Sequence, residues 1–246
     1  MSVRVSEIFG PTIQGEGAMI GLPTLFIRTG GCDYRCVWCD TPHAVLSEHR
    51  ASWIKTEERE IVSRCEELAL PPMWVTLSGG NPALQDCGQL VSELHTAGYS
   101  VCVETQGSLA PTWLRYVDHL VVSPKPPSSG METDWEKFFE CCRLARHELT
   151  VKVVVADEQD LAYAIQAFDN ALTLKYATSF HSTLRYFARL HLAVQPCNAT
   201  FTGEYDQEAA LEKTRWLVKE ITSRRMNQVR VLPQLHSLLW GNKIGV

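Results

Sequence analysis

The chain has 246 residues, of which 45% are hydrophobic and 21% charged, and its formal net charge is −5. This balance is typical of a folded globular protein and excludes a disordered chain, and the acidic charge argues against a general nucleic-acid binder, which presents a basic face. No apolar stretch approaches the roughly 20 residues of a membrane span, and the first residues form no apolar signal region. We therefore expect a cytoplasmic protein with no membrane partner and no direct nucleic-acid partner. Because α/β barrels of about 250 residues commonly form one unit, residues 1–246 are expected to be a single domain.

Short runs of β-branched or aromatic residues predict seven strands, at residues 24–28, 74–77, 100–104, 119–122, 150–155, 191–194 and 229–232. Apolar residues at helical spacing predict helices within residues 56–69, 90–97, 135–146, 161–168 and 210–221. Thr56 is expected to cap the first of these helices and Gly98 to end the second. The stretch 170–189 shows no clear pattern. Alternating strands and helices predict an α/β fold of right-handed βαβ units on a parallel sheet, either barrel-like or doubly wound.

Five of the predicted strands lead into loops rich in Gly, Pro, Cys or polar residues, at residues 30–41, 78–82, 104–107, 123–127 and 195–196. Gly, Pro, Ser and Asn also form ordinary turns, so any single loop of this kind is uninformative. Parallel α/β folds place their sites at the carboxyl ends of the strands, and all five loops share that edge. We therefore expect the functional site there.

The chain has nine cysteines, an odd number that excludes a complete set of disulfides. In a reducing compartment, a cluster of cysteines favours metal binding or catalysis. Six cysteines are scattered and are expected to be small buried side chains: Cys65, Cys87, Cys102, Cys141, Cys142 and Cys197.

The other three, Cys32, Cys36 and Cys39, have the spacing C-x3-C-x2-C, which lets three thiolates of one short loop converge on one inorganic centre. Structural zinc normally takes four ligands, and only His43 offers itself as a fourth here. An electron-transfer [4Fe–4S] cluster also normally takes four cysteines, so three would leave one iron open to another ligand. The residues favour such an open-iron cluster, with zinc and inert thiols as alternatives.

This triad, with an aromatic residue (Trp38) before its third cysteine, resembles the signature of radical S-adenosylmethionine enzymes, and Gly79-Gly80 resembles the stretch that holds the methionine amino group. Further blocks narrow the resemblance to the 7-carboxy-7-deazaguanine synthase family. These blocks are residues 9–17 (FGPTIQGEG), 39–41 (CDT), 104–107 (ETQG), 123–127 (SPKPP) and 240–243 (WGNK).

The resemblance implies a partial, roughly six-stranded parallel β/α barrel and a ring contraction on the route to 7-deazapurines such as queuosine. The cluster would reduce S-adenosylmethionine, and the resulting 5′-deoxyadenosyl radical would take hydrogen from C6 of 6-carboxy-5,6,7,8-tetrahydropterin. Rearrangement and loss of ammonia would then give 7-carboxy-7-deazaguanine, with S-adenosylmethionine regenerated as a cofactor. No protein residue is implied as catalytic beyond the cluster and this cofactor; the protein positions the reacting atoms.

Carried over position by position, the resemblance assigns the cluster to Cys32, Cys36 and Cys39. The implied substrate-binding residues are Ile13, Gln14, Gly15, Arg28, Ser78 and the terminal Val246. The implied contacts of S-adenosylmethionine are Val37, Trp38, Cys39, Gly80, Glu104, Ser123, Pro124, Lys125 and Gln195. Thr41 matches the Mg²⁺ position, and a hydroxyl suits that hard cation. An arginine such as Arg28 can hold a carboxylate through two parallel hydrogen bonds, which a lysine does not reproduce.

Asn81 departs from the pattern of many radical S-adenosylmethionine enzymes, which carry Glu there. An amide oxygen can still accept a hydrogen bond from the cofactor's amino group, without the added charge attraction. Two alternatives remain open. One is an activase that makes a glycyl radical on a partner protein, which shares the triad and the Gly-Gly stretch, and the other is a non-enzymatic zinc module. The segment around Gln14 and Arg28 favours a small-molecule substrate over a protein. The resemblance also suggests a homodimer and an electron donor of flavodoxin type.

Overall fold

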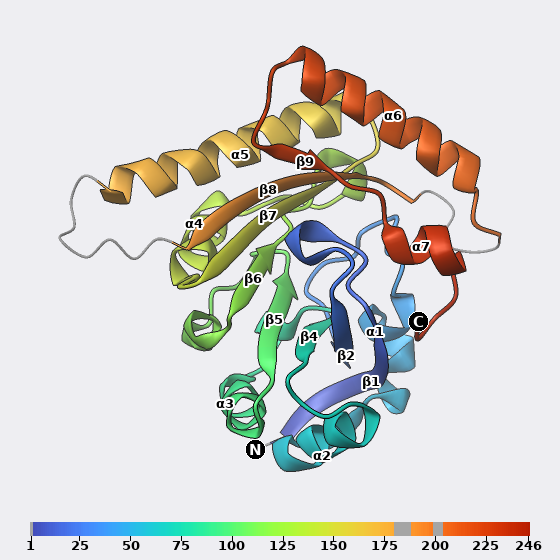
Figure 1. Ribbon diagram of the computed structural model, residues 1–246, viewed down its shortest axis with the longest axis vertical. Helices are drawn as coiled ribbons and strands as arrows, with labels where there is room; N and C mark the ends of the chain where they lie inside the picture. The colour runs from blue at the N-terminus through green and yellow to red at the C-terminus, as the bar shows by residue number, and fades with distance from the viewer. Residues whose placement is uncertain (1, 180–187, 199–203) are drawn as a thin grey trace.

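The computed structural model describes residues 2–179, 188–198 and 204–246, and these form one open nine-stranded sheet. In spatial order the strands are β3 (Ile54–Glu57), β1 (Ser2–Ile13), β2 (Pro23–Thr29), β4 (Trp74–Gly79), β5 (Ser100–Thr105), β6 (His119–Val122), β7 (Glu148–Val155), β8 (Arg189–Pro196) and β9 (Val229–Val231). The pairs from β2 to β9 are all parallel, and β1 is antiparallel to both of its neighbours. The edge strands β3 and β9 are not paired with each other, so the sheet curves as a partial barrel that does not close (Figure 1). The predicted α/β fold is confirmed.

All seven predicted strands are present as the parallel strands β2 and β4–β9. The prediction missed β1 and β3, the two strands outside the parallel set. In β1 the residues Gly10 and Pro11 interrupt the strand pattern, because Pro lacks the amide hydrogen of a sheet ladder and Gly weakens a strand. The ladder between β1 and β2 is correspondingly irregular, with register shifts between Val5 and Glu7 and between Phe9 and Thr12.

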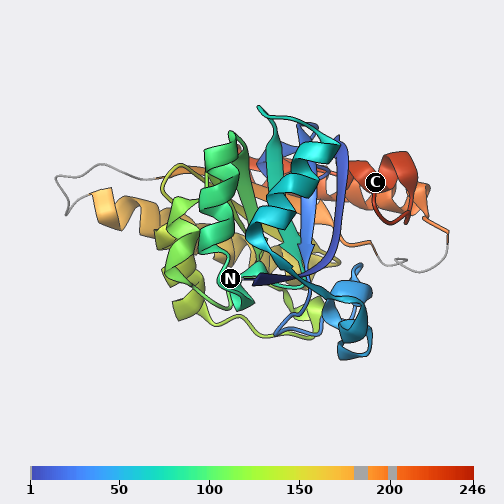
Figure 2. The ribbon, with the colours of Figure 1, turned by 90° about the horizontal axis from the view of Figure 1, so that it is seen from below.

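The longer helices cover the convex face of the sheet, as two views show (Figures 1 and 2). The longer ones are α2 (Glu58–Leu68), α3 (Gly88–Ala97), α4 (Trp135–Leu144), α5 (Glu158–Ser179) and α6 (Gln207–Ser223). Each overlaps a predicted helix. Shorter helices are α1 (Pro42–Val45), α7 (Leu235–Trp240), η1 (Gly17–Met19), η2 (Ser47–Ser52), η3 (Pro82–Leu84), η4 (Thr112–Tyr116) and η5 (Pro127–Ser129).

Two expectations about helix ends can be compared directly. Gly98 does end α3, with a left-handed φ of 94°. The prediction that Thr56 caps α2 is wrong, because Thr56 lies inside β3 and Glu57 occupies the capping position. Residues 170–189 showed no clear pattern in the sequence. In the structure α5 continues to Ser179 and β8 begins at Arg189, while residues 180–187 lie outside the described part.

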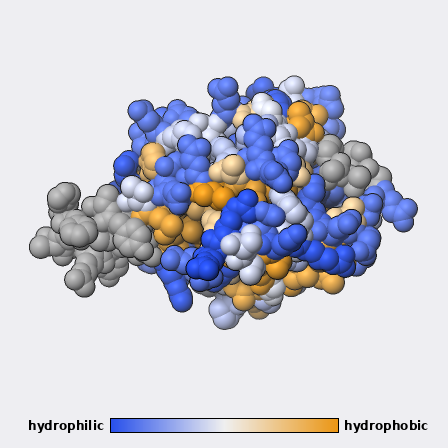
Figure 3. Space-filling model, turned by 90° about the horizontal axis from the view of Figure 1, so that it is seen from above, coloured by the Kyte–Doolittle hydropathy of each residue, from blue (hydrophilic) through white to orange (hydrophobic). Residues whose placement is uncertain are grey.

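The two faces of the sheet have different chemistry because successive side chains of a strand point to opposite sides. Buried apolar side chains such as Leu77, Val103 and Leu120 face the helices and form one large core. The concave face carries polar side chains such as Thr76 and Lys152. On the outer face over α5 and α6, hydrophilic residues predominate and apolar ones show between them (Figure 3). Within the described residues, no helix is long and apolar enough to cross a membrane.

Candidate active site

A cavity of about 270 Å³ opens at the carboxyl ends of the parallel strands. Its lining includes nearly all of the predicted site residues: Ile13, Gln14, Gly15, Arg28, Cys32, Cys36, Trp38, Cys39, Thr41, Ser78, Gly80, Glu104, Ser123, Lys125, Gln195 and Val246. Val37 and Pro124 are predicted site residues that do not line it. Val37 is 69% exposed, and its backbone amide donates a 3.0 Å hydrogen bond to the Ser129 carbonyl. The five loops that the sequence placed at one edge therefore meet around one cavity.

The three cysteines of the triad lie on the loop between β2 and α1, which we call the cysteine loop (residues 30–41). Cys32, Cys36 and Cys39 are partly exposed, whereas the other six cysteines are buried. Burial is the largest cause that raises the pKa of all three thiols. The pKa of Cys36 reaches about 11, with Cys39 and Cys32 adding to the effect of burial and Lys125 opposing it. Because their pKa values are raised, the three thiols need a cationic group beside them to remain ionised as thiolates. The iron ions of a cluster provide such a group.

The zinc alternative finds less support in the geometry. Across the described ranges, no three His, Cys, Asp or Glu side chains are grouped to hold a single metal ion. His43, the proposed fourth zinc ligand, instead lies with its Nε2 3.1 Å from Oε1 of Glu7. His43 is therefore engaged by Glu7, so the structure gives no support to it as a fourth zinc ligand.

The cysteine loop is held from one side by the segment after β6. The indole Nε1 of Trp38 donates a 3.0 Å hydrogen bond to Oγ of Ser128, and that hydroxyl donates to the buried carboxylate of Asp160. Nζ of Lys125 lies 6.0 Å from the centre of the Trp38 ring. These contacts hold Trp38, the residue before the third cysteine, as one wall of the cavity.

Arg28, at the carboxyl end of β2, is oriented by β1. Its Nε donates a 2.6 Å hydrogen bond to Oε1 of Glu7, and its guanidinium lies over the Phe9 ring, 5.5 Å from the ring centre. Burial raises the pKa of Glu7, but His43 and Arg28 outweigh it, so that the pKa is lowered. Glu7 binds only the Nε edge of Arg28, which leaves the terminal nitrogens available for a planar anion.

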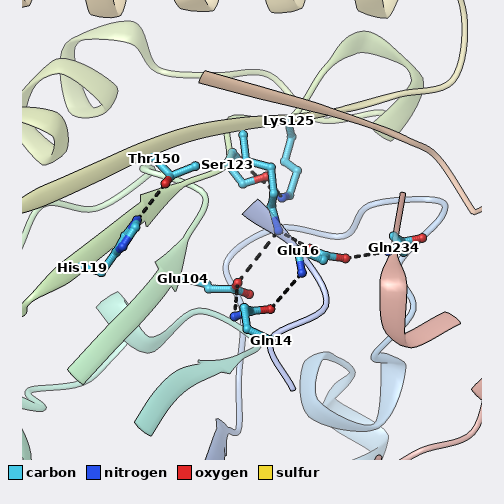
Figure 4. Close-up of polar contacts among 9 residues, drawn as sticks. Gln14, Glu16, Glu104, His119, Ser123, Lys125, Thr150 and Gln234 are labelled. Atoms are coloured by element: carbon cyan, nitrogen blue, oxygen red, sulfur yellow. Dashed lines mark hydrogen bonds and ion pairs between the residues drawn. The ribbon is translucent and has the colours of Figure 1, made fainter. Parts of the chain in front are cut away.

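A buried charged network forms the floor of the cavity (Figure 4). Lys152 of β7 forms a close ion pair with Glu16, and its Nζ lies 4.0 Å from Oε1 of Glu104. Gln14 donates to Glu104 over 3.2 Å, and Gln234 donates to Glu16 over 2.7 Å. Burial opposes both charges of the ion pair, yet the pKa of Glu16 is lowered by Lys152 and the pKa of Lys152 is raised by Glu104 and Glu16.

The sequence analysis missed Lys152, Glu16 and Gln234 as site residues. A signal for Lys152 was present, because a lysine stands alone in a run of buried β-branched residues and its side chain must find a partner there. Glu16 belongs to the FGPTIQGEG block but was not singled out. Gln234 carried no signal, since its contact with Glu16 joins residues more than 200 positions apart.

Two buried polar atoms of the cavity wall have no partner among the described residues. They are Oγ of Ser78 and Oε1 of Gln195, at the ends of β4 and β8. Buried polar atoms in proteins are nearly always hydrogen-bonded, so each of these two atoms is placed to bind a ligand or a water molecule in the cavity. Both residues are among those that the family resemblance assigns to ligand binding.

The end of the chain and Thr41 complete the cavity. Residues 241–246 all line it, beyond α7. Thr41 stands at the first position before α1, but its side chain makes no capping hydrogen bond; Oγ1 lies 3.7 Å from the Cys39 sulphur. The hydroxyl of Thr41 is therefore not required by the helix.

Comparison with known proteins identifies relatives along the whole chain, although no family model matches it. The 7-carboxy-7-deazaguanine synthase of Bacillus cereus is 35% identical, with 99% of each chain covered. That of Bacillus subtilis is also 35% identical, over 99% of this chain and 98% of the relative. Among solved structures, QueE from Escherichia coli has a TM-score of 0.68 and 25% identity, covering 96% of this chain and 95% of that one. With the cysteine loop, the cavity and the fold in agreement, this chain belongs to the 7-carboxy-7-deazaguanine synthase family.

Proposed function

We propose that the chain converts 6-carboxy-5,6,7,8-tetrahydropterin to 7-carboxy-7-deazaguanine with loss of ammonia, in the biosynthesis of queuosine and related 7-deazapurines. The observation that carries the proposal is one cavity that is lined by the cysteine triad, by Arg28 and by two buried polar atoms. Among the described residues, the terminal nitrogens of Arg28 and the two buried polar atoms have no hydrogen-bond partner. Membership of the family favours this reaction over a glycyl-radical activase and over a zinc module.

Cys32, Cys36 and Cys39, which all line the cavity, would hold a [4Fe–4S] cluster there. The cluster and S-adenosylmethionine, when bound, supply the one-electron chemistry that removes a hydrogen atom from C6 of the substrate. The residues proposed to surround S-adenosylmethionine are Val37, Trp38, Cys39, Gly80, Glu104, Ser123, Pro124, Lys125 and Gln195. Of these, Gln195 offers the unpaired buried oxygen and Trp38 the fixed aromatic wall.

The substrate would lie between Arg28 and the charged floor. Arg28 binds the carboxylate with its terminal nitrogens, since Glu7 holds the opposite edge of the guanidinium. Gln14, backbone groups of Ile13 and Gly15, Oγ of Ser78 and the terminal carboxylate of Val246 offer hydrogen-bond partners to the pterin edge. The fixed charges of the floor, rather than a mobile solvent shell, orient the ring so that C6 is held in one place.

Mg²⁺ would bind between Oγ1 of Thr41 and oxygens of the substrate. The Thr41 hydroxyl is free of a capping role, and hydroxyl, carboxylate and water oxygens are the ligands that Mg²⁺ prefers. A homodimer and an electron donor of flavodoxin type remain part of the proposal, supported by the resemblance to the family. The single-domain organisation of residues 1–246 stays a prediction.

The decisive experiment is anaerobic incubation of the reconstituted protein with the carboxypterin, S-adenosylmethionine, Mg²⁺ and a chemical reductant, followed by mass analysis of the product. Cys32→Ala, Cys36→Ala and Cys39→Ala should each lose the absorbance near 400 nm and the product. Cys65→Ala is the matched control, because Cys65 is fully buried in α2 and far from the cysteine loop in sequence. A Cys65→Ala protein without iron, or a wild-type protein with iron but no product, would contradict the proposal.

A further inference from the structure

Asn81, which follows β4, uses its whole hydrogen-bonding capacity inside the protein. Its Oδ1 accepts from Oγ1 of Thr105 over 2.8 Å and from the amide of Ala83 over 3.2 Å. Its Nδ2 donates to Asp33 over 2.9 Å and to Ser108 over 3.2 Å. An amide side chain has two donors and room for two accepted bonds, so none is left. Asn81 is also fully buried and does not line the cavity, so its oxygen is not available to the amino group of a cofactor.

The contact of Asn81 with Asp33 reaches into the cysteine loop, where Asp33 directly follows Cys32. The same carboxylate oxygen, Oδ1, also accepts a 2.6 Å hydrogen bond from Nε2 of Gln106. Gln106 follows β5, the strand next to β4. Two amide groups from neighbouring strand ends therefore converge on one loop carboxylate, and we call Asn81 and Gln106 the amide clamp.

Gln106 makes a second contact that concerns the sulphur itself. Its Nε2 lies 3.6 Å from Sγ of Cys32, within hydrogen-bonding distance for sulphur, and the backbone amide of Tyr34 donates to the same atom over 3.4 Å. Gln106 is only 6% exposed, so water does not compete strongly for its donors. Hydrogen bonds to ligand sulphurs are among the factors that set the reduction potential of an iron–sulphur cluster.

We propose that the amide clamp fixes the cysteine loop through Asp33 and that Gln106 raises the reduction potential of the bound cluster through its hydrogen bond to the Cys32 sulphur. The proposal rests on the proposed function, because it takes Cys32 as a cluster ligand. Its physical basis is that an N–H donor stabilises the more negative, reduced cluster more than the oxidised one. The position that carries Glu in many radical S-adenosylmethionine enzymes then serves, in this chain, to hold the loop rather than the cofactor.

The reduction potential tests the contact with sulphur. Gln106→Met removes both donors without adding charge, and anaerobic redox titration of the reconstituted variant, followed by electron paramagnetic resonance, should give a more negative potential than the wild type. Ser108→Ala is the matched control, because it removes a partner of Asn81 that touches neither Asp33 nor Cys32. An unchanged potential in Gln106→Met with full iron content would overturn the tuning role.

Iron retention tests the clamp. Gln106→Glu places a carboxylate against Asp33 and should weaken retention of iron against a chelator about 10- to 100-fold, the range seen when an outer hydrogen bond of a metal site is lost. Adding Asp33→Asn to this variant supplies an amide at position 33 that can donate to the new carboxylate at position 106, so iron retention should recover. The reduction potential should stay below that of the wild type, because the side chain at position 106 still has no N–H donor for the Cys32 sulphur. Equal retention in Gln106→Glu and the wild type would overturn the clamp. A wild-type protein that assembles no cluster would overturn the proposed function as well, so the two failures are distinguishable.

Discussion

Glu7 and Arg28 form a pair across the antiparallel strands β1 and β2, joined by a 2.6 Å hydrogen bond from the guanidinium Nε. The same oxygen of Glu7 lies 3.1 Å from Nε2 of His43, the residue that follows Pro42 at the start of α1. One carboxylate thus connects the proposed substrate arginine to the helix that ends the cysteine loop. Arg28 is therefore oriented by β1, one of the two strands that were not predicted.

Replacing Glu7 should weaken substrate binding without removing the cluster. Glu7→Ala frees the guanidinium to adopt other rotamers, and the loss of a charge-assisted hydrogen bond of about 1.5–3 kcal/mol corresponds to roughly a 10- to 150-fold weaker affinity at most. Glu7→Gln retains an acceptor for Nε and should fall between Glu7→Ala and the wild type. Binding of the carboxypterin to the iron-loaded protein, measured by calorimetry without reductant, gives the comparison. Equal affinity in Glu7→Ala and the wild type would show that Arg28 needs no such support.

The sequence predicted the strands and helices in which buried apolar residues follow a regular pattern. Parallel strands that are buried along nearly their whole length, such as β6 and β7, appear in the sequence as short runs of β-branched residues. The helices between the strands show a clear apolar stripe. The strand β1 was not accessible, because Gly10 and Pro11 resemble a turn. The end of α5 was missed because its pattern weakens after residue 168.

The site could be predicted from two other features of the sequence, the spacing of the cysteines and the positions of the strand ends. Spacing alone indicated that Cys32, Cys36 and Cys39 act together, and strand ends indicated the face on which they lie. The partners across long sequence separations were not accessible, since nothing local in Lys152 specifies Glu16. The same holds for Asn81, whose contacts with Asp33 and Thr105 depend on how neighbouring strand ends meet.

The ion pair between Lys152 and Glu16 should contribute strongly to stability. Lys152→Met leaves two partly buried carboxylates, Glu16 and Glu104, without their cation. Breaking a fully buried pair in this way costs about 3–5 kcal/mol, which is the upper limit here. Adding Glu16→Gln removes one of those charges, so the double variant should be more stable than Lys152→Met alone. Urea unfolding of the wild type, Lys152→Met, Glu16→Gln and the double variant measures the four free energies of unfolding. A double variant whose loss equals the sum of the two single losses would show that the residues are not coupled.

Thr41→Ala should separate the magnesium site from the cluster. Because the Thr41 hydroxyl caps no helix, its removal should leave folding, iron content and S-adenosylmethionine binding unchanged. Substrate affinity and the response of turnover to added Mg²⁺ should both fall, since the ion then keeps mainly substrate and water oxygens. Thr41→Ser, which retains the hydroxyl, is the matched control. Identical Mg²⁺ titration curves for Thr41→Ala and the wild type would exclude this residue as the ligand.

His119 should make stability depend on pH. Its ring nitrogen Nε2 lies 2.7 Å from Oγ1 of Thr150 on the concave face (Figure 4), and burial lowers the pKa of His119 to about 4, with the charge of His191 adding to the effect and Glu148 opposing it. In the unfolded chain the pKa of histidine is about 6.5. Between these values the unfolded state binds a proton that the folded state does not, so this residue's contribution to stability falls as pH drops from 6.5 toward 4.

Between pH 7 and pH 5 the free energy of unfolding should fall by about 2 kcal/mol because of His119. This figure follows from about 1.4 kcal/mol for each pH unit below the unfolded-state pKa. His119→Gln places an amide near the position of Nε2 and cannot take up the proton. The difference in unfolding free energy between the wild type and this variant should therefore shift by that amount between pH 7 and pH 5. A constant difference across the two pH values would mean that His119 is not kept neutral by its surroundings.

The end of the chain should be sensitive to extension. Residues 241–246 line the cavity, and the two ends of the chain lie well apart in both ribbon views (Figures 1 and 2). A terminal carboxylate there can accept a charge-assisted hydrogen bond from the N–H-rich pterin edge, worth roughly 1.5–3 kcal/mol. A C-terminal tag, or removal of residues 244–246, should therefore weaken substrate affinity about 10- to 150-fold. An N-terminal tag is the control and should leave affinity unchanged, because β1 begins at Ser2 away from the cavity. Iron content should be the same in all these proteins, since none of the changes touches the cysteine loop. Wild-type affinity in the C-terminally extended protein would remove Val246 from the substrate site.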